Sequence, residues 1–211
     1  MTISLNEGSL LSFIISATDA DVPTQTLVYS ATGLPSGATF NAATRTFSWT
    51  PTEAQGPNTY QVTFSVTDGI ATTSEVVTIT VNEVNVAPVL TAIGPKSVAE
   101  GSLLSFIISA TDADVPTQTL VYSATGLPTG ATFNAATRTF SWTPTEAQGP
   151  SSPVVTFSVS DGVATTSEAV TITVTEVNVA PVLGAITNKT INEGALLSFT
   201  ASATDADLPA R

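Results

Sequence analysis

Residues 60–69, YQVTFSVTDG, decide the fold class because apolar and polar side chains alternate along them. Val62, Phe64 and Val66 fall on one side of an extended chain, and glutamine, threonine and serine fall on the other. A period of two residues is typical of a β-strand with one face buried and the other in water. The Asp-Gly pair that closes the stretch is a common turn. These residues therefore predict a half-buried strand that ends in a turn.

The flanking sequence continues the pattern and predicts about seven strands. Residues 72–82 (TTSEVVTITVN) alternate in the same way, and residues 10–17 (LLSFIISA) place their large apolar side chains on one face. Further strands are expected near residues 2–5 and 27–31, and on both sides of the turn at residues 41–46, with Phe47 and Trp49 in the core. Seven strands separated by turns predict a Greek-key sandwich of the immunoglobulin type.

The sequence contains this pattern twice because it repeats with a period of 93 residues. Residues 7–99 and 100–192 differ at 15 of 93 positions, so both copies must share one fold. We expect an all-β chain of tandem seven-stranded sandwiches, with one repeat at residues 1–87, a second at 88–180 and a partial third at 181–211. The partial repeat is too short to bury a core, so we expect it to be poorly ordered or to borrow the sheet edge of a neighbour.

The composition excludes several classes of function. The net charge of −12 repels a phosphate backbone, so no nucleic-acid partner is expected. The chain has no cysteine and no histidine, which removes thiolate and imidazole metal ligands and the most common catalytic base. Catalysis is therefore not expected, and only oxygen atoms remain as metal ligands. No apolar run approaches the ~18 residues that a transmembrane helix needs.

The acidic residues are not scattered over the sequence. All 17 fall at seven positions of the repeat, nearly all at strand ends or in loops. In the first repeat these positions are Glu7, Asp19, Asp21, Glu53, Asp68, Glu75 and Glu83. Carboxylates gathered at the ends of stacked modules can hold hard divalent cations, above all Ca²⁺.

Simpler explanations exist for some of these acids. Asp19 and Asp21 could have no role beyond capping a turn, because aspartate side chains accept hydrogen bonds from nearby backbone amides. The Asp-Gly pair at residues 68–69 alone would be an ordinary turn. Glu75 and Glu168 stand at the start of a strand, where solvated edge residues are expected.

Two other side chains have a structural and a functional interpretation. Trp49 and Trp142 could stack on a sugar, but an indole that follows a phenylalanine in a sandwich pattern favours a place in the core. Arg45 and Arg138 stand in a turn, where each could pair with a nearby acid.

Three stretches of the first repeat together resemble a cadherin repeat. They are ATFNAATRTFSWTPTEAQG (38–56), YQVTFSVTDG (60–69) and VVTITVNEVNVAPV (76–89). The resemblance covers both complete repeats, and it is strongest to the cadherin-like modules, dystroglycan-type or Ig-like, of large bacterial surface adhesins. It implies Ca²⁺ at each join between repeats, held by acids and a linker of one repeat and by a DxD pair and an Asp-Gly of the next.

The resemblance implies a set of metal ligands at each join. At the first join these are Glu7, Glu53, Glu83 and Asn85 of the first repeat, with Asp112, Asp114 and Asp161 of the second. At the second join they are Glu100, Glu146, Glu176 and Asn178, with Asp205 and Asp207. Asp19, Asp21 and Asp68 would face a preceding module. Val86 and Val179 stand where many relatives have an aspartate, so we expect one or two calcium ions per join.

The expected function follows from this resemblance. The chain is predicted to be a calcium-binding spacer or adhesion segment at the cell surface, outside the cell. Its partners would be the neighbouring repeats of the same chain and other surface proteins or glycans. The alternative is a metal-independent Ig-like spacer, or a carbohydrate-binding accessory module of a secreted protein.

Overall fold

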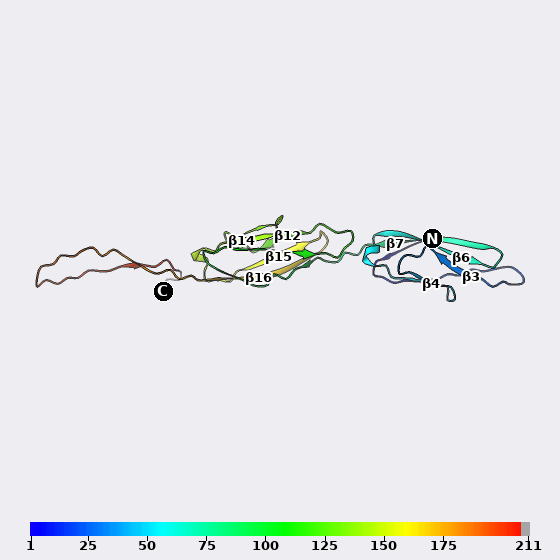
Figure 1. Ribbon diagram of the computed structural model, residues 1–211, viewed down its shortest axis with the longest axis horizontal. Coiled ribbons are helices and arrows are strands. Elements are labelled where there is room, and N and C mark those ends of the chain that lie inside the picture. The colour runs from blue at the N-terminus through cyan, green and yellow to red at the C-terminus, as the bar shows by residue number, and fades with distance from the viewer. Residues whose placement is uncertain (208–211) are drawn as a thin grey trace. The chain divides into compact units, whose positions relative to one another are not determined.

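The computed structural model describes residues 1–207 and divides into two compact units (Figure 1). The first unit contains residues 1–86 and the loop 112–119, and the second contains residues 87–111 and the chain from residue 120 onward. The loop 112–119 belongs to the second repeat by sequence but to the first unit by its contacts. The described residues 1–207 form no helix that could span a lipid bilayer.

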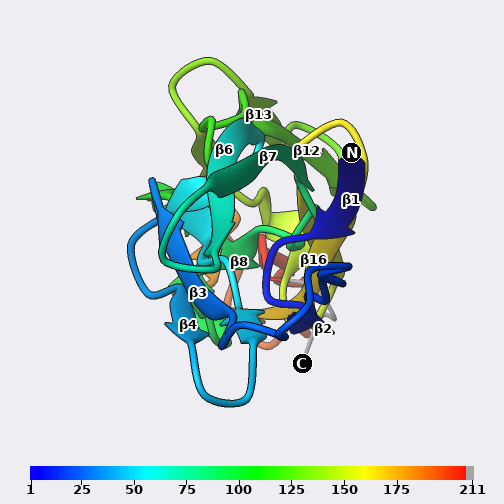
Figure 2. The ribbon, with the colours of Figure 1, turned by 90° about the vertical axis from the view of Figure 1, so that its right-hand side faces the viewer.

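The first unit contains the seven strands that the sequence predicts, and Figure 2 labels β1, β2, β3, β4, β6 and β7 among them. They are β1 (Thr2–Asn6), β2 (Leu11–Ile14), β3 (Val28–Thr32), β4 (Thr39–Asn41), β5 (Thr46–Trp49), β6 (Asn58–Thr67) and β7 (Thr72–Asn82). One sheet has the order β1-β7-β6-β3 and the other β2-β5-β4. Strand β1 runs parallel to β7, whereas the other pairs are antiparallel.

The alternating side chains of these strands form the core. Phe47, Val62 and Ile79 are fully buried, and the ring of Phe47 packs edge-on against Phe64 at a centroid distance of 5.7 Å. Trp49 is 1% exposed, and its Nε1 donates a hydrogen bond to the carbonyl of Ser36 at 3.2 Å. This confirms the core interpretation of the tryptophan and leaves its indole unable to stack on a sugar.

The second unit repeats the sandwich and adds one short strand pair. Its strands are β8 (Val89–Leu90), β9 (Lys96–Ala99), β10 (Leu104–Ile107), β11 (Ala110–Thr111), β12 (Val121–Thr125), β13 (Thr132–Asn134), β14 (Thr139–Trp142), β15 (Val154–Ser160) and β16 (Thr165–Thr175). The sheets have the orders β12-β15-β16-β9 and β10-β14-β13, and β8 pairs with β11. Phe140, Trp142 and Ile172 fill the core as their counterparts do in the first unit.

The turn arginines differ from the expectation of an ion pair. Arg45 and Arg138 have φ values of 61° and 59°, in the left-handed region. Their guanidinium groups lie over the rings of Tyr29 and Tyr122, with distances of 5.8 and 5.7 Å to the ring centroids. A cation over an aromatic face is attracted by the negative potential of the ring, so these arginines stabilise the sandwich.

The partial third repeat pairs with itself. Strand β17 (Val182–Leu183) pairs antiparallel with β18 (Ala203–Thr204). Within residues 181–207 the third repeat therefore does not add to the sheet of a neighbouring repeat, which was one of the two expectations from the sequence. Leu196 and Phe199 are 91% and 51% exposed. The large apolar side chains therefore stay in water, as expected for a segment too short to form a core.

Candidate metal centres

The parallel pairing of β1 with β7 places two glutamates side by side. In this register Asn6 lies opposite Asn82, so Glu7 and Glu83 follow at the same end of the two strands. The amide of Glu7 donates to the carbonyl of Asn82 at 3.1 Å, and the amide of Val84 donates to Glu7 Oε1 at 3.0 Å. The strand register therefore brings together two acids that are far apart in sequence.

A third glutamate reaches them from a short 3₁₀ turn, Glu53–Gln55. The side chain of Gln55 holds this turn, because Oε1 accepts from the amide of Thr52 at 3.0 Å and Nε2 donates to the carbonyl of Ser36 at 3.1 Å. Gly56 follows, and the carboxylate of Glu7 occupies the space where a Cβ atom of residue 56 would lie. A glycine at this position thus allows the acid to lie against the backbone.

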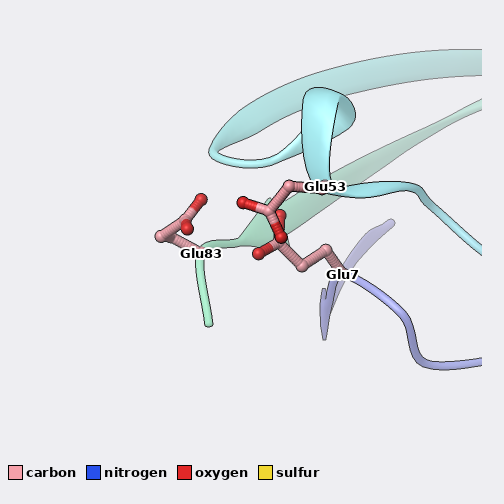
Figure 3. A group of neighbouring side chains, drawn as sticks. All are labelled: Glu7, Glu53 and Glu83. Atoms are coloured by element: carbon pink, nitrogen blue, oxygen red, sulfur yellow. The ribbon is translucent and has the colours of Figure 1, made fainter. Parts of the chain in front are cut away.

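Figure 3 shows the three carboxylates pointing toward one another. Glu7, Glu53 and Glu83 each offer an oxygen, and these oxygens lie within 4.8 Å of one another. Glu7 is 7% exposed, and its Oε2 and both oxygens of Glu83 are buried without a hydrogen-bond partner among the described residues. Oxygens that lie within 4.8 Å of one another can share one Ca²⁺ ion, whose oxygen ligands stand about 2.3–2.6 Å from the metal.

The loop 112–119 lies beside this cluster within the first unit. Asp114 is 1% exposed, and its Oδ1 accepts from the amide of Val86 at 2.8 Å. The amide of Val115 donates to Glu53 Oε1 at 3.0 Å, and Gln118 Nε2 donates to Asn85 Oδ1 at 3.1 Å. The second oxygens of Asp112 and Asp114 are buried and unpartnered in the described structure.

The electrostatics of the cluster are unfavourable without a cation. Burial, followed by the negative charges of Glu7, Glu53 and Asp114, raises the pKa of Glu83 to about 7. Burial and like charges both disfavour the ionised carboxylate. A divalent cation would reverse this effect because it stabilises the charged form, and the donor set consists of the oxygen atoms that Ca²⁺ prefers.

The second unit contains the equivalent cluster. Oxygens of Glu100, Glu146 and Glu176 lie within 4.8 Å of one another, and Glu100 Oε1 accepts from the amide of Val177 at 2.8 Å. The carboxylate of Glu100 occupies the Cβ position of Gly149, as Glu7 does at Gly56. Burial, followed by the charges of Glu100, Glu146 and Asp207, raises the pKa of Glu176.

The DxD pair of the third repeat completes this second cluster. Asp207 is 6% exposed, and its Oδ1 accepts from the amide of Val179 at 2.8 Å, while its own amide donates to Asp205 Oδ1 at 3.1 Å. Asn178 is exposed. The same arrangement thus occurs twice, once in each unit.

A second kind of acidic group, made of three aspartates, occurs in the first unit. Oxygens of Asp19, Asp21 and Asp68 lie within 4.8 Å of one another. The amide of Asp21 donates to Asp19 Oδ1 at 2.9 Å, which is the capped turn that the simpler explanation predicts. The amides of Ala71 and then Ile70 donate to Asp68 and lower its pKa.

The counterpart of Asp68 in the second unit makes the same turn. Asp161 is 8% exposed, and its Oδ1 accepts from the amides of Val163 and Ala164, both at 2.6 Å. In these Asp-Gly turns one oxygen is used by the backbone. The turn explanation and a metal site therefore do not exclude each other, because the second carboxylate oxygen is not needed for the turn.

Sequence reasoning missed several residues of these centres, and one expectation was wrong. Gly56, Gly149 and Gln118 were not singled out, although the glycine that follows each acidic turn is visible in the repeat. Glu168 is not a solvated edge residue: its two carboxylate oxygens accept from the amides of Ile93 and Gly94 at 2.9 and 2.8 Å. Glu75 is 69% exposed, as predicted for an edge residue.

Comparison with known proteins agrees with this architecture. The model of the "Putative Ig domain" family matches residues 1–82 and again residues 87–175. The "Serine-rich adhesin for platelets" of Staphylococcus aureus strain MRSA252 is 37% identical over 129 residues, which are 61% of this chain and 9% of the adhesin. The same adhesin from strain USA300 is equally similar, over 6% of its length. The chain therefore spans less than a tenth of these relatives.

Two solved structures of cadherin domains have a similar fold. The EC1-4 region of PcdhgB3 gives a TM-score of 0.55 at 18% identity, over 98% of this chain and 57% of that one. Extracellular cadherin domains 1-5 of Protocadherin Gamma B2 give 0.50 at 14% identity, over 98% and 45%. At such identities the similarity concerns the fold alone, which is that of tandem cadherin-like and Ig-like β-sandwiches.

Proposed function

This chain belongs to the Putative Ig domain family, and we propose that it is a calcium-binding segment of an extracellular cell-surface adhesion protein. The observation that carries the proposal is the cluster of Glu7, Glu53 and Glu83: it offers carboxylate oxygens within 4.8 Å of one another, and three oxygens of Glu7 and Glu83 are buried without a hydrogen-bond partner among the described residues. The similarity to a staphylococcal adhesin supports the adhesive context.

The first proposed centre combines residues of two successive repeats. Glu7, Glu53, Glu83 and Asn85 come from the first repeat, whereas Asp112 and Asp114 come from the TDAD motif of the second. A cation bound by both sets would link the repeats through metal–oxygen bonds in addition to the present hydrogen bonds. Its proposed effect is to stiffen the connection.

Asp161 is proposed as a further ligand on the basis of repeat equivalence. Asp112, Asp114 and Asp161 of the second repeat correspond to Asp19, Asp21 and Asp68 of the first. Those three aspartates of the first repeat lie close enough to share one cation. The second proposed centre uses Glu100, Glu146, Glu176 and Asn178 with Asp205 and Asp207. We propose one or two ions per centre. Each centre contains a compact group of three glutamates, which could hold one ion, and a pair of aspartates from the next repeat, which could share that ion or hold a second.

The stabilisation expected from each ion is small. At ~1 mM Ca²⁺ and a dissociation constant of ~0.1–1 mM, which is typical of extracellular modules, binding contributes about 0.4–1.4 kcal/mol. The folds have their own cores and do not depend on it. The proposed role of calcium is therefore to restrict motion between repeats rather than to fold them.

Small-angle X-ray scattering tests this proposal. The chain and the variant Asp112→Asn/Asp114→Asn are each measured in 1 mM CaCl₂ and in chelator. Calcium should narrow the distribution of interatomic distances more for the parent chain than for the variant, which keeps only the second proposed centre. Identical curves in all four conditions would refute calcium-dependent stiffening and favour a metal-independent spacer.

A further inference from the structure

The two repeats differ most in one short stretch. Of the 15 differences between residues 7–99 and 100–192, four are consecutive, and they replace NTYQ (58–61) of the first repeat by SSPV (151–154) of the second. In each unit the stretch follows the 3₁₀ turn and a Gly-Pro pair. The same place in the same fold is therefore built in two ways.

In the first unit the side chain of Tyr60 fills the space beside the 3₁₀ turn. Its ring stands edge-on to Trp49, with the ring centroids 4.9 Å apart. Its hydroxyl donates a hydrogen bond to the carbonyl of Gln55 at 3.0 Å. Gly56, the next residue after the turn, is buried. The phenol ring thus joins the turn to the tryptophan of the core.

The second unit has a hollow of about 440 Å³ at the equivalent place. Trp142, Gln148 and Gly149 line it, together with Pro153, which stands where the first unit has the tyrosine. A proline ring is smaller than a phenol ring and has no hydroxyl. Gly149 is only half-buried, whereas its counterpart in the first unit is buried. No residue of the proposed calcium centres lines the hollow.

The polar groups beside the hollow differ from those of the first unit. The hydroxyl of Ser151 donates to the carbonyl of Gln148, but a carbonyl oxygen has two lone pairs and can accept a second donor. In the first unit the amide of Thr59 donates to Asn58 Oδ1 at 2.8 Å. The counterpart amide, that of Ser152, has no hydrogen-bond partner among the described residues. The rim of the hollow therefore offers a backbone donor as well as an acceptor.

The backbone groups of Ser152 face away from strand β16. Ser151 exchanges both of its backbone hydrogen bonds with Val174, at 3.3 and 2.8 Å, and successive residues of a strand direct these groups to opposite sides. On the other side the pairing of β12 with β15 ends at Thr125 and Thr156. Strand β12 therefore does not reach Ser152, and the sheet edge is open beside the hollow.

We propose that the hollow of the second unit binds a tyrosine side chain from an extended segment of a partner protein. The phenol ring lies against Trp142 and its hydroxyl donates to the carbonyl of Gln148, as Tyr60 does with the equivalent groups of the first unit. The backbone of the segment pairs with Ser152. Main-chain hydrogen bonds then supply affinity, and the side chain in the hollow supplies specificity. A buried aromatic anchor of this kind contributes much of the affinity of an interface.

The tyrosines of this sequence do not supply the ring. Tyr29 and Tyr122 are 9% and 8% exposed, and their hydroxyls accept from the amides of Ala17 and Ala110 at 3.1 Å. The third, Tyr60, occupies the site in its own unit. None is available to the hollow of a second copy, which favours a different protein as the partner.

A capped peptide of sequence TVYVT tests the proposal in chelator, where calcium does not contribute. In an NMR titration it should shift the amide signals of residues 147–152 and the indole signal of Trp142, with a dissociation constant of ~0.1–1 mM. TVAVT should bind at least about tenfold more weakly because it lacks the aromatic ring. TVFVT should bind about 2–10-fold more weakly because it lacks the hydroxyl.

The ring alone is supplied by p-cresol, which cannot pair with the backbone of Ser152. It should bind at least about tenfold more weakly than TVYVT. Equal binding of p-cresol and the peptide would overturn the assignment of the hollow to a polypeptide partner. Equal binding of TVAVT, or no shift at 10 mM TVYVT, would overturn the proposal as a whole.

Two variants exchange the residues of the repeats. Pro153→Tyr fills the hollow as in the first unit and should abolish binding of the peptide without lowering the melting temperature, because the same fold holds a tyrosine there. Val154→Gln is the matched control: it exchanges the adjacent residue, which does not line the hollow, and should bind as the parent does. Unaltered binding to Pro153→Tyr would refute the proposed site.

The reverse exchange, Asn58→Ser/Thr59→Ser/Tyr60→Pro, should give the first unit a hollow of its own. The peptide should then also shift the indole signal of Trp49, and the bound stoichiometry should rise from one to two. A folded triple variant that binds no second peptide would overturn the proposal. All of these measurements are made without calcium, so their outcome is independent of the proposed calcium centres.

Discussion

Replacing Asp114 by asparagine should have opposite effects in the absence and presence of calcium. Asp114 is 1% exposed and contributes to the repulsion that raises the pKa of Glu83. Asparagine keeps an oxygen for the amide of Val86 but removes the charge. Without calcium the variant should be at least as stable as the parent, because one of the clustered negative charges is gone.

With calcium the order should reverse. The parent gains about 0.4–1.4 kcal/mol at ~1 mM Ca²⁺. For a domain of this size 1 kcal/mol corresponds to about 4–8 °C, so its melting temperature should rise by about 2–11 °C. The variant should lose most of this rise because an amide oxygen is a weaker ligand than a carboxylate.

Differential scanning calorimetry of both proteins, in chelator and in 1 mM CaCl₂, measures these four melting temperatures. Glu193→Gln is the matched control, since Glu193 is an exposed acid outside the described clusters. It should respond to calcium as the parent does. An equal calcium response in Asp114→Asn, or a variant much less stable than the parent in chelator, would refute the electrostatic reasoning.

Three further predictions follow from the same geometry. In chelator, the free energy of unfolding should fall as the pH rises from about 4.5 to 7. Glu83 has a pKa of about 7 in the folded chain and keeps a proton that the unfolded chain, with a carboxyl pKa of 4.5, releases. Urea unfolding at pH 5 and 7.5 measures this difference, and equal stability at the two pH values would contradict the prediction. Gly56→Ala should weaken calcium binding by about 10–100-fold, because the added methyl group displaces the carboxylate of Glu7. Isothermal titration calorimetry measures the change in affinity. An unaltered affinity would show that the carboxylate of Glu7 is not a ligand. Phe140→Ala should destabilise the second unit by about 3–5 kcal/mol, since the ring is fully buried. In thermal unfolding, the transition of the second unit should then shift to a lower temperature and that of the first should not. If neither transition shifts, the ring does not contribute to the core.

Much of the fold could be predicted from residues that obey a simple period. The alternation at Val62, Phe64 and Val66 places strand β6, and the 93-residue repeat extends the prediction to the second unit. Trp49 could be assigned to the core for the same reason. These features depend on local pattern and burial, which a single sequence displays.

The acidic clusters could be predicted only in part. The resemblance to cadherin repeats placed Glu7, Glu53 and Glu83 together, and the structure brings their oxygens within 4.8 Å. It could not indicate that Gly56 makes room for Glu7, or that Gln118 donates to Asn85. Such contacts depend on where distant backbone segments pass each other, and no sequence period records that.

Glu168 shows why position along a strand is a poor guide to solvent contact. It stands in strand β16 as an edge residue would, yet its two oxygens accept from the amides of Ile93 and Gly94. Those amides come from a segment 74 and 75 residues earlier in the chain. The interaction became visible only when the path of residues 88–94 was known.

Equilibrium dialysis against calcium, with the bound metal counted by elemental analysis, tests whether the two acidic centres bind calcium. We expect saturable binding of one or two ions at each of the two centres, with dissociation constants of ~0.1–1 mM. The double variant Glu83→Gln/Glu176→Gln should lose most of this binding. No bound calcium at 10 mM, or the same bound amount in the double variant, would show that these acids do not form calcium sites.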